Sequence, residues 1–257
     1  MSHIYNDTFF DYINASARAS AKPFVALLFP QLQPQSVIDL GSGRGVWLDE
    51  WKRGGASDVL AVDGDYVNRD TLAVDPQEFL AADLTKPVET GRRFDLAQSL
   101  EVGEHLPTSA SATLVDSLTA ASDRVLFSAA VTGQGGEFHI NEQSLSFWRD
   151  LFAARGYTAY DCVRPNLKDN SDIAPWYRYN AILYVNAQGR KGLPREILET
   201  EIPAGTPVRN AGSMGWRMRL AVVSKLPRRA VTFIAQARAL VLALQARRKS
   251  AGGRVSA

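Results

Sequence analysis

The chain alternates short apolar runs with longer segments whose apolar residues recur at helical spacing. Seven runs are rich in β-branched and aliphatic residues, end at polar or glycine-containing positions, and predict strands. They cover residues 37–40, 59–62, 79–82, 94–100, 124–131, 157–163 and 179–185. Helical spacing follows Gly45, Thr108 or Ser109, and Asn141, and predicts the connecting helices. Strands that alternate with helices indicate an α/β fold with a largely parallel sheet.

Further helices are expected outside this core. Before the first strand, helical spacing over residues 9–17 and a proline at position 23 predict two short helices, which Pro30 and Pro34 end. We expect residues 1–190 to form the main domain and residues 191–257 a C-terminal extension. In the extension, prolines and glycines between 203 and 215 predict an irregular connection, and a helix over 230–248 places its apolar residues on one face.

Charge sets this extension apart from the rest of the chain. The whole sequence carries a formal net charge of +2, yet from Pro203 to Ala257 it has 11 Lys and Arg residues and no Asp or Glu. Such a segment suits phosphate, anionic lipid or an acidic partner. The apolar stretch within 230–248 is too short to span a membrane. We expect the helix to lie on a membrane surface, or to pack against the body or another subunit. The acidic remainder argues against specific nucleic-acid binding.

Cysteine usage bears on the location of the protein. Cys162 is the only cysteine, so no internal disulfide can form, and the first twenty residues contain no long apolar run. Both features favour the cytoplasm, with a peripheral membrane location if the basic helix binds lipid.

The first predicted strand ends in a glycine-rich turn. Asp39 precedes Gly41, Ser42, Gly43 and Gly45, and glycine permits a sharp bend and the close approach of a ligand to the backbone. A dinucleotide-binding turn of the form G-x-G-x-x-G would place its third glycine at position 46, which is a valine here. The D-x-G-x-G-x-G pattern instead resembles the first motif of class I S-adenosylmethionine (SAM)-dependent methyltransferases.

The next strand ends supply further cofactor-binding candidates. Asp63 ends the second strand about twenty residues after the glycine turn, where an acid can accept hydrogen bonds from ribose hydroxyls; Gly64 follows it. The resemblance implies that Asp83 faces the adenine amino group and that Leu84 packs on the ring. We also assign Ser99, near the end of the fourth strand, to the cofactor site. The alternative for each acid is an ordinary turn residue.

Candidate catalytic residues follow the fourth and fifth strands. Glu101, Glu104 and His105 are spaced i, i+3, i+4, so one helical turn would aim all three in the same direction. His105 could act as a general base titrating near pH 6.5, oriented by Glu101. Alternatively, Glu101, Glu104 and His105 could bind a divalent metal such as Mg²⁺. The E-x-x-E-H string resembles that of the ubiquinone-biosynthesis O-methyltransferases, where it is associated with a metal. A structural role is the third alternative. His139, after the fifth strand, is expected at the same rim because ligands bind at the carboxyl ends of parallel strands.

Several strings together extend the resemblance over roughly residues 5–187. E-V-x-E-H-L, G-Q-G-G, H-x-N-E-Q and W-Y-R-x-N resemble a group of bacterial class I methyltransferase-domain proteins. This resemblance implies a Rossmann-like seven-stranded sheet of order 3-2-1-4-5-7-6, mostly parallel, with helices on both faces. It also implies SAM as methyl donor. We expect O-methylation of a sugar, a glycoconjugate or a small metabolite. The alternatives are N-methylation of a small molecule and a non-catalytic SAM-binding module.

Overall fold

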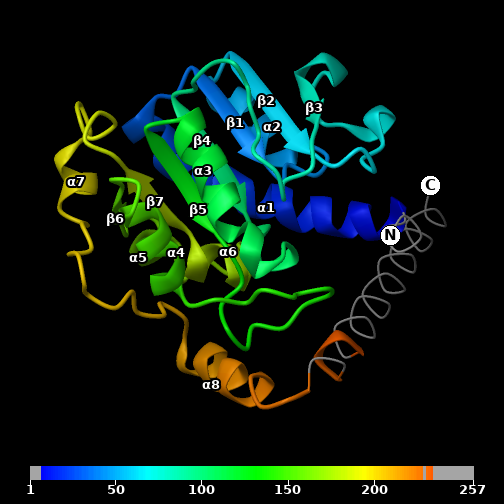
Figure 1. The fold of residues 1–257 in the computed structure, drawn as a ribbon, viewed down its shortest axis with the longest axis vertical. Coiled ribbons are helices and arrows are strands. Elements are labelled where there is room, and N and C mark those ends of the chain that lie inside the picture. Colours follow the sequence, from blue (N-terminus) through cyan, green and yellow to red (C-terminus); the bar gives the residue numbers. More distant parts are fainter. Residues whose placement is uncertain (1–6, 228–229, 234–257) are drawn as a thin grey trace, which may run out of the picture.

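A seven-stranded sheet forms the centre of the computed structural model, which describes residues 7–227 and 230–233. The strands follow the order β3-β2-β1-β4-β5-β7-β6, which confirms the predicted topology (Figure 1). Their bounds are β1 Ser36–Leu40, β2 Asp58–Asp63, β3 Phe79–Ala81, β4 Leu96–Leu100, β5 Arg124–Ser128, β6 Thr158–Tyr160 and β7 Ile182–Val185. β1 to β5 are parallel, and β7 pairs antiparallel with both β5 and β6.

Helices cover both faces of this sheet. The longer ones are α1 Asp7–Leu32, α2 Val46–Gly54, α3 Ser111–Ala121, α4 Leu145–Ala153 and α8 Met214–Val223; the short ones are α5 Arg164–Leu167, α6 Pro175–Asn180 and α7 Arg195–Leu198. Two apolar clusters result. One joins the sheet to α1 and α2, and the other joins it to α3 and α4. Aromatic contacts mark both layers: Phe24 meets Trp47 edge-on at 5.3 Å, and Phe152 stacks on Tyr184 at 4.0 Å.

The prediction of two short helices before the first strand is wrong, because α1 continues through Pro23. Ala21, Phe24 and Leu28 are fully buried on both sides of that proline. A proline inside a helix costs about 3 kcal/mol, and burying one large apolar side chain returns about 1.5–3 kcal/mol. The continuous apolar face therefore keeps the helix intact.

The predicted helix caps also differ from those observed. Asn141 does not cap α4; Ser144 does, with its hydroxyl accepting from the N–H of Phe147. Neither Thr108 nor Ser109 caps α3, whose first residue is Ser111, because residues 108–110 form a separate 3₁₀ turn. The Thr108 hydroxyl, which was expected to cap α3, instead donates a hydrogen bond to Oδ1 of the buried Asn141.

The C-terminal extension is partly described and is tied to the body. The helix predicted over 230–248 lies mostly outside the described residues. The connection predicted to be irregular has neither helix nor strand from 203 to 213, and α8 begins at its end, at Met214. Ser213 caps the N-terminus of α8 by accepting from the N–H of Trp216. Two buried arginines hold the segment before α8: Arg149 donates to Thr206 O, and Arg164 donates to Arg209 O.

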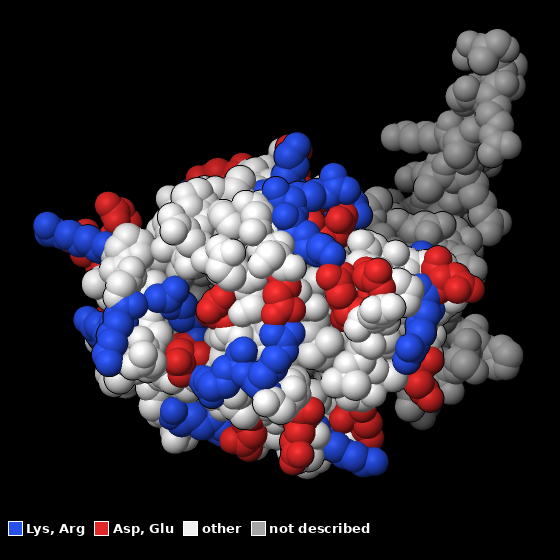
Figure 2. Space-filling view, turned by 90° about the horizontal axis from the view of Figure 1, so that it is seen from above, with Lys and Arg blue, Asp and Glu red and all other residues white. Residues whose placement is uncertain are grey.

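The surface charge is mixed on the face seen in Figure 2, where basic and acidic side chains of the described residues lie interspersed. Among the described residues, no helix is both long enough and apolar enough to cross a membrane.

Candidate functional site

The loop between β1 and α2 contains three glycines with φ angles in the left-handed region. Gly41, Gly43 and Gly45 have φ angles of 90°, 53° and 76°, which other residues adopt only with strain. A Cβ at Gly41 would also lie 2.3 Å from a methyl carbon of Val102. The N–H of Gly41 donates to Val62 O at 2.8 Å. The loop is therefore fixed between the end of β2 and the segment that follows β4.

Asp63 fastens this loop from the end of β2. One carboxylate oxygen accepts from the N–H of Gly43 at 2.7 Å, and the other accepts from the N–H of Gly64 at 2.7 Å and from the Tyr66 hydroxyl. A carboxylate offers about four acceptor positions, so these bonds leave capacity for a ligand. The ribose contact predicted for Asp63 stays a prediction.

Other predicted cofactor residues have side chains that point into the protein. Asp39 is 2% exposed and accepts from Gln98 Nε2 at 2.8 Å. Burial raises its pKa to about 7, and the charge of Asp63 adds to the rise, although the bond from Gln98 opposes it. Ser99 is buried and donates to Leu40 O, and Ser42 is also buried. Asp39 and Ser99 therefore form hydrogen bonds within the sheet beside the loop. Direct contact of these residues with a cofactor stays a prediction.

The segment after β3 is arranged differently. Asp83 is exposed and accepts from both the N–H and the hydroxyl of Thr85, and these bonds lower the pKa of its carboxyl group. Leu84 is buried in the apolar cluster on the α3 side of the sheet. The predicted adenine contacts of both residues remain untested.

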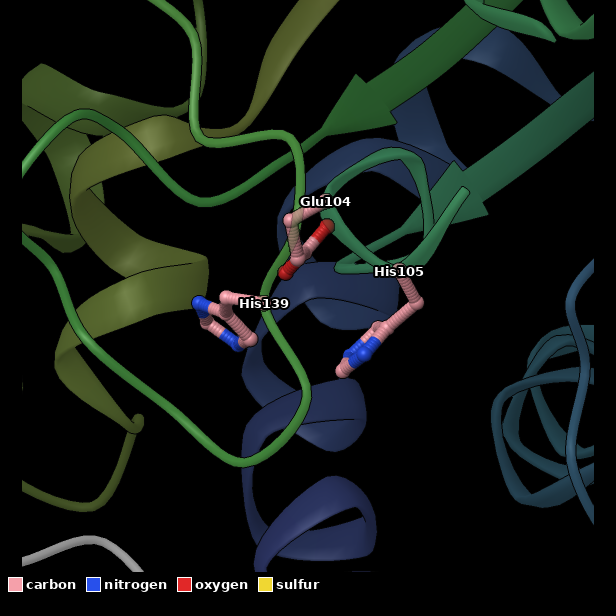
Figure 3. Close-up of side chains that lie close together, drawn as sticks. All are labelled: Glu104, His105 and His139. Atoms are coloured by element: carbon pink, nitrogen blue, oxygen red, sulfur yellow. The ribbon is translucent and has the colours of Figure 1, made fainter. Parts of the chain in front are cut away.

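Chemistry-bearing side chains meet where β4 and β5 end. Glu104 and His105 belong to a 3₁₀ turn, Gly103–His105, and His139 lies on the loop after β5. Each offers one ligand atom, and these atoms all lie within 4.8 Å of one another. The two imidazole rings meet edge to face with centroids 5.0 Å apart, as Figure 3 shows. The parallel neighbours β4 and β5 thus bring the two histidines together, as the sequence predicted.

Glu101 takes a different position from the one predicted. Its φ angle is 57° and the 3₁₀ turn begins only at Gly103, so the idea of one helical turn carrying all three residues is wrong. Its carboxylate accepts from Gln134 Nε2 at 2.8 Å and from Asn180 Nδ2 at 3.4 Å. His139 takes its place in the group of metal-ligand type.

Burial dominates the electrostatics of this cluster. Glu104 is 1% exposed, and neither of its carboxylate oxygens has a hydrogen-bond partner. Burial, and then the charge of Glu101, raise the pKa of Glu104 well above its ordinary value. Desolvation within the cluster and the neighbouring His139 lower the pKa of His105, although the residue is exposed to solvent. The direction of this shift favours the neutral imidazole, and the titration near pH 6.5 expected from the sequence stays a prediction.

The loop after β5 is organised by Glu142. Its carboxylate accepts from the N–H groups of Gly133 and Gly135 at 2.8 and 2.6 Å, and it contacts His139 Nδ1 at 2.9 Å. Burial opposes ionisation, yet the bonds from His139 and from the two glycine amides lower the pKa of Glu142. The carboxylate fixes the His139 ring and leaves Nε2 facing away from it.

Sequence reasoning missed three residues around this cluster. Gln134 and Asn180 bond each other at 2.8 Å and both donate to Glu101. Burial raises the pKa of Tyr177, and the charges of Glu101 and Glu104 add to that rise. Tyr177 also meets Trp47, on the first turn of α2, at 5.1 Å. The G-Q-G-G string contained Gln134, and the W-Y-R-x-N string contained Tyr177 and Asn180. Neither string revealed the cluster, because α6 comes from a connection whose position in space the sequence left open.

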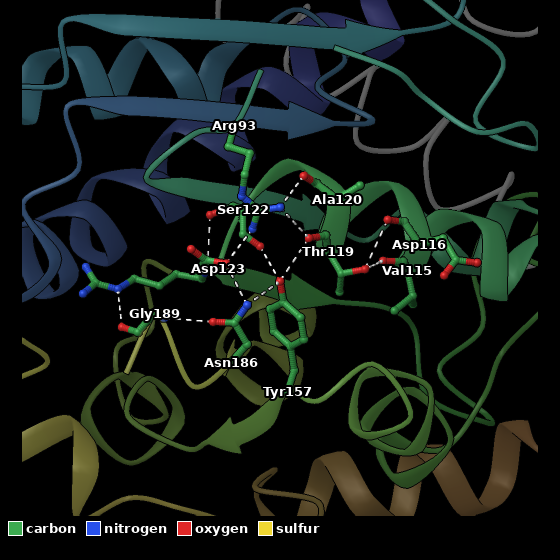
Figure 4. A network of polar contacts seen from close by, with 11 residues as sticks. Arg93, Val115, Asp116, Thr119, Ala120, Ser122, Asp123, Tyr157, Asn186 and Gly189 are labelled. Atoms are coloured by element: carbon green, nitrogen blue, oxygen red, sulfur yellow. Dashed lines mark hydrogen bonds and ion pairs between the residues drawn. The ribbon is translucent and has the colours of Figure 1, made fainter. Parts of the chain in front are cut away.

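A second polar network lies at the opposite end of β5 (Figure 4). Asp123 accepts from Arg93 and from Asn186, and the Tyr157 hydroxyl donates to Ser122 O. These bonds join the start of β5 to the segments that flank β6 and β7. Because they lie away from the carboxyl ends of the parallel strands, we assign them a structural role.

A model of a family described as "Methyltransferase domain" matches residues 13–161, more than half of the chain. The chain belongs to this methyltransferase family. The matched segment runs from α1 to β6 and contains the glycine loop, Asp63 and the Glu104–His105–His139 cluster. No curated protein matches the methyltransferase.

Solved structures share the fold of the methyltransferase. DesVI from Streptomyces venezuelae is 13% identical with a TM-score of 0.53, and the match covers 69% of this chain and 96% of that chain. An O-methyltransferase family protein from Burkholderia thailandensis is 12% identical with a TM-score of 0.51, covering 68% of this chain and 59% of the other. SAM-bound CalS10 from Micromonospora echinaspora, an amino pentose methyltransferase, is 12% identical with a TM-score of 0.50, covering 72% and 98%. These structures share the fold of the methyltransferase and include a SAM-bound enzyme, CalS10.

Proposed function

We propose that the methyltransferase transfers the methyl group of SAM to a hydroxyl group of a sugar, a glycoconjugate or a small metabolite, with a divalent cation held by Glu104, His105 and His139. The observation that carries this proposal is the buried Glu104 carboxylate without a hydrogen-bond partner. Burial raises the pKa of Glu104 well above its ordinary value, so without a cation this carboxyl group is protonated and unpaired, and a bound cation would displace the proton and supply the missing partner. The adjacent ligand-type nitrogens supply the rest of a coordination shell.

The protonation state of His105 fits such a cation. Metal ligands must be deprotonated histidines and carboxylates, and the lowered pKa of His105 favours its neutral imidazole. The raised pKa of Glu104 means that the cation would have to displace the proton of that carboxyl group. His139 contacts the Glu142 carboxylate through Nδ1, an arrangement that typically orients a metal-binding histidine and fixes its tautomer. One carboxylate with two imidazoles is a ligand set that first-row transition metals, Mn²⁺ among them, accept more readily than Mg²⁺ does. Mg²⁺, the ion expected from the sequence, prefers oxygen ligands.

Different residues bind the donor, hold the cation and position the cation ligands. The glycine loop and Asp63 bind the donor, whose sulfonium already activates the methyl group, so catalysis consists mainly of placing acceptor and donor in line. A bound cation would lower the pKa of the acceptor hydroxyl. Glu142 holds His139 in place, and Gln134 with Asn180 holds Glu101 beside Glu104. A lowered pKa makes His105 a weaker general base, and the clustering of Glu104, His105 and His139 favours the metal over His105 acting alone as base.

Calorimetry with Mn²⁺ tests the site. Chelator-treated protein should bind about one Mn²⁺ per chain, and Glu104→Gln or His139→Ala should weaken binding by about tenfold or more. Glu137→Gln, on the same loop but outside the cluster, is the matched control and should bind normally. Mn²⁺ binding that is absent, or unchanged in Glu104→Gln, would contradict the metal site.

The acceptor class needs a separate assay. Release of the demethylated cofactor should be followed with matched hydroxyl- and amine-bearing sugars, because the neighbours of this fold include both an O-methyltransferase family protein and an amino pentose methyltransferase. If the methyltransferase turns over only the amine-bearing sugars, the proposed O-methylation is contradicted and N-methylation takes its place.

A further inference from the structure

Helix α8 has two distinct faces. Leu220 points inward and packs with Val131 and Leu145. On the other side Met214, Met218 and Val222 are 71%, 63% and 62% exposed. A spacing of four residues places all three on one side of the helix. Large apolar side chains gathered on one outward face are typical of an interaction surface rather than of an ordinary protein surface.

Positive charge surrounds this face. Arg217 and Lys225 are exposed on or just after the same helix. No acidic residue occurs anywhere from Pro203 to Ala257, which carries 11 Lys and Arg residues. An apolar face bordered by cations and free of acids is the pattern of a helix that lies in the plane of an anionic membrane interface.

We propose that the Met214–Met218–Val222 face of α8 binds the surface of an anionic phospholipid bilayer. A second copy of the chain is a poorer partner, because a symmetric contact would place Arg217 and Lys225 against the same cations. The chain's own residues after α8 offer no better match, since they contain no acid to pair with those cations.

The position of α8 links this surface to the catalytic loop. Arg219 Nη1 donates to Gln134 O at 2.7 Å, and a Cβ on Gly133 would lie 2.3 Å from Leu220 O. The helix therefore packs directly on the loop that carries His139, and Figure 1 shows it below that loop on the outside of the molecule. A bilayer bound to α8 lies one loop away from the site of methyl transfer.

Vesicle flotation with the full-length protein tests the proposal. The protein should float with phosphatidylcholine vesicles containing about 30 mol% phosphatidylglycerol, and it should not float with pure phosphatidylcholine. Met218→Gln combined with Val222→Gln should reduce the partition coefficient about tenfold or more, because both apolar contacts with the bilayer are lost. Lys225→Gln should reduce it roughly fivefold at low salt.

Leu80→Gln is the matched control, because Leu80 is also an exposed apolar residue, at 38%, but lies on β3; it should float like the wild type. Calorimetry with SAM checks that each variant is folded. Flotation of the double variant equal to that of the wild type, or no flotation of the wild type, would overturn the proposal. So would a wild-type dimer, detected by light scattering, that the double variant disrupts.

Discussion

Replacing Asp39 by asparagine should stabilise the protein in a pH-dependent way. Asp39 is 2% exposed at the end of β1, and its carboxylate accepts from Gln98, which in turn accepts from Trp51 Nε1. Burial raises its pKa from 3.8 to about 7. Between these pH values the folded protein holds a proton that the unfolded chain has released, so stability falls as pH rises through this window.

The size of the effect follows from the pKa difference. At about 1.4 kcal/mol per pH unit, ionisation of Asp39 lowers the free energy of unfolding by about 4 kcal/mol once the pH exceeds 7. The asparagine side chain introduced by Asp39→Asn would keep an acceptor for Gln98 and carry no charge. Its two amide hydrogens need partners, and any cost of leaving them unpaired, about 1–3 kcal/mol, is the same at every pH. The pH-dependent part is therefore separable from the rest.

Urea denaturation at about pH 5 and about pH 8 measures it. The free energy of unfolding of Asp39→Asn relative to the wild type should rise by about 3 kcal/mol between the two pH values. Asp65→Asn changes an exposed acid nearby and should show little pH-dependent difference. If the difference between Asp39→Asn and the wild type is the same at both pH values, Asp39 ionises normally and the reasoning from burial fails.

Two other substitutions test the structure around the cofactor loop. Gly103→Ala should destabilise the protein by about 1–3 kcal/mol, because the new Cβ would lie 2.7 Å from the Trp148 ring; thermal unfolding should show partial recovery on adding Trp148→Phe, and no recovery would contradict the steric explanation. Asp63→Ala should weaken SAM binding by about tenfold or more, since charge-assisted hydrogen bonds contribute about 1.5–3 kcal/mol and the amide of Gly43 loses its anchor. Calorimetry measures this loss, and unchanged affinity would exclude Asp63 from the cofactor site.

The α/β architecture follows from local sequence patterns. Buried parallel strands appear in the sequence as apolar β-branched runs. The positive φ angles of the turn after β1 require the glycines at 41, 43 and 45. Both signals lie in short stretches of sequence and can be recognised without the structure. The order of the strands followed from a family resemblance. The convergence of His105 and His139 followed from topology, because parallel neighbours end at one edge of the sheet.

Tertiary structure decided what each polar side chain does. The i, i+3, i+4 spacing predicted that the side chains of Glu101, Glu104 and His105 share one direction. The backbone at Glu101 instead has a positive φ angle, and its carboxylate bonds to Gln134 and Asn180, which come from distant segments. The pKa of His105 depends on desolvation by the surrounding cluster and on His139, neither of which its own sequence neighbours reveal. Periodicity identifies an element and its inward face. Hydrogen-bond partners and desolvation arise only when segments far apart in the chain pack together, and they set the chemistry of this site.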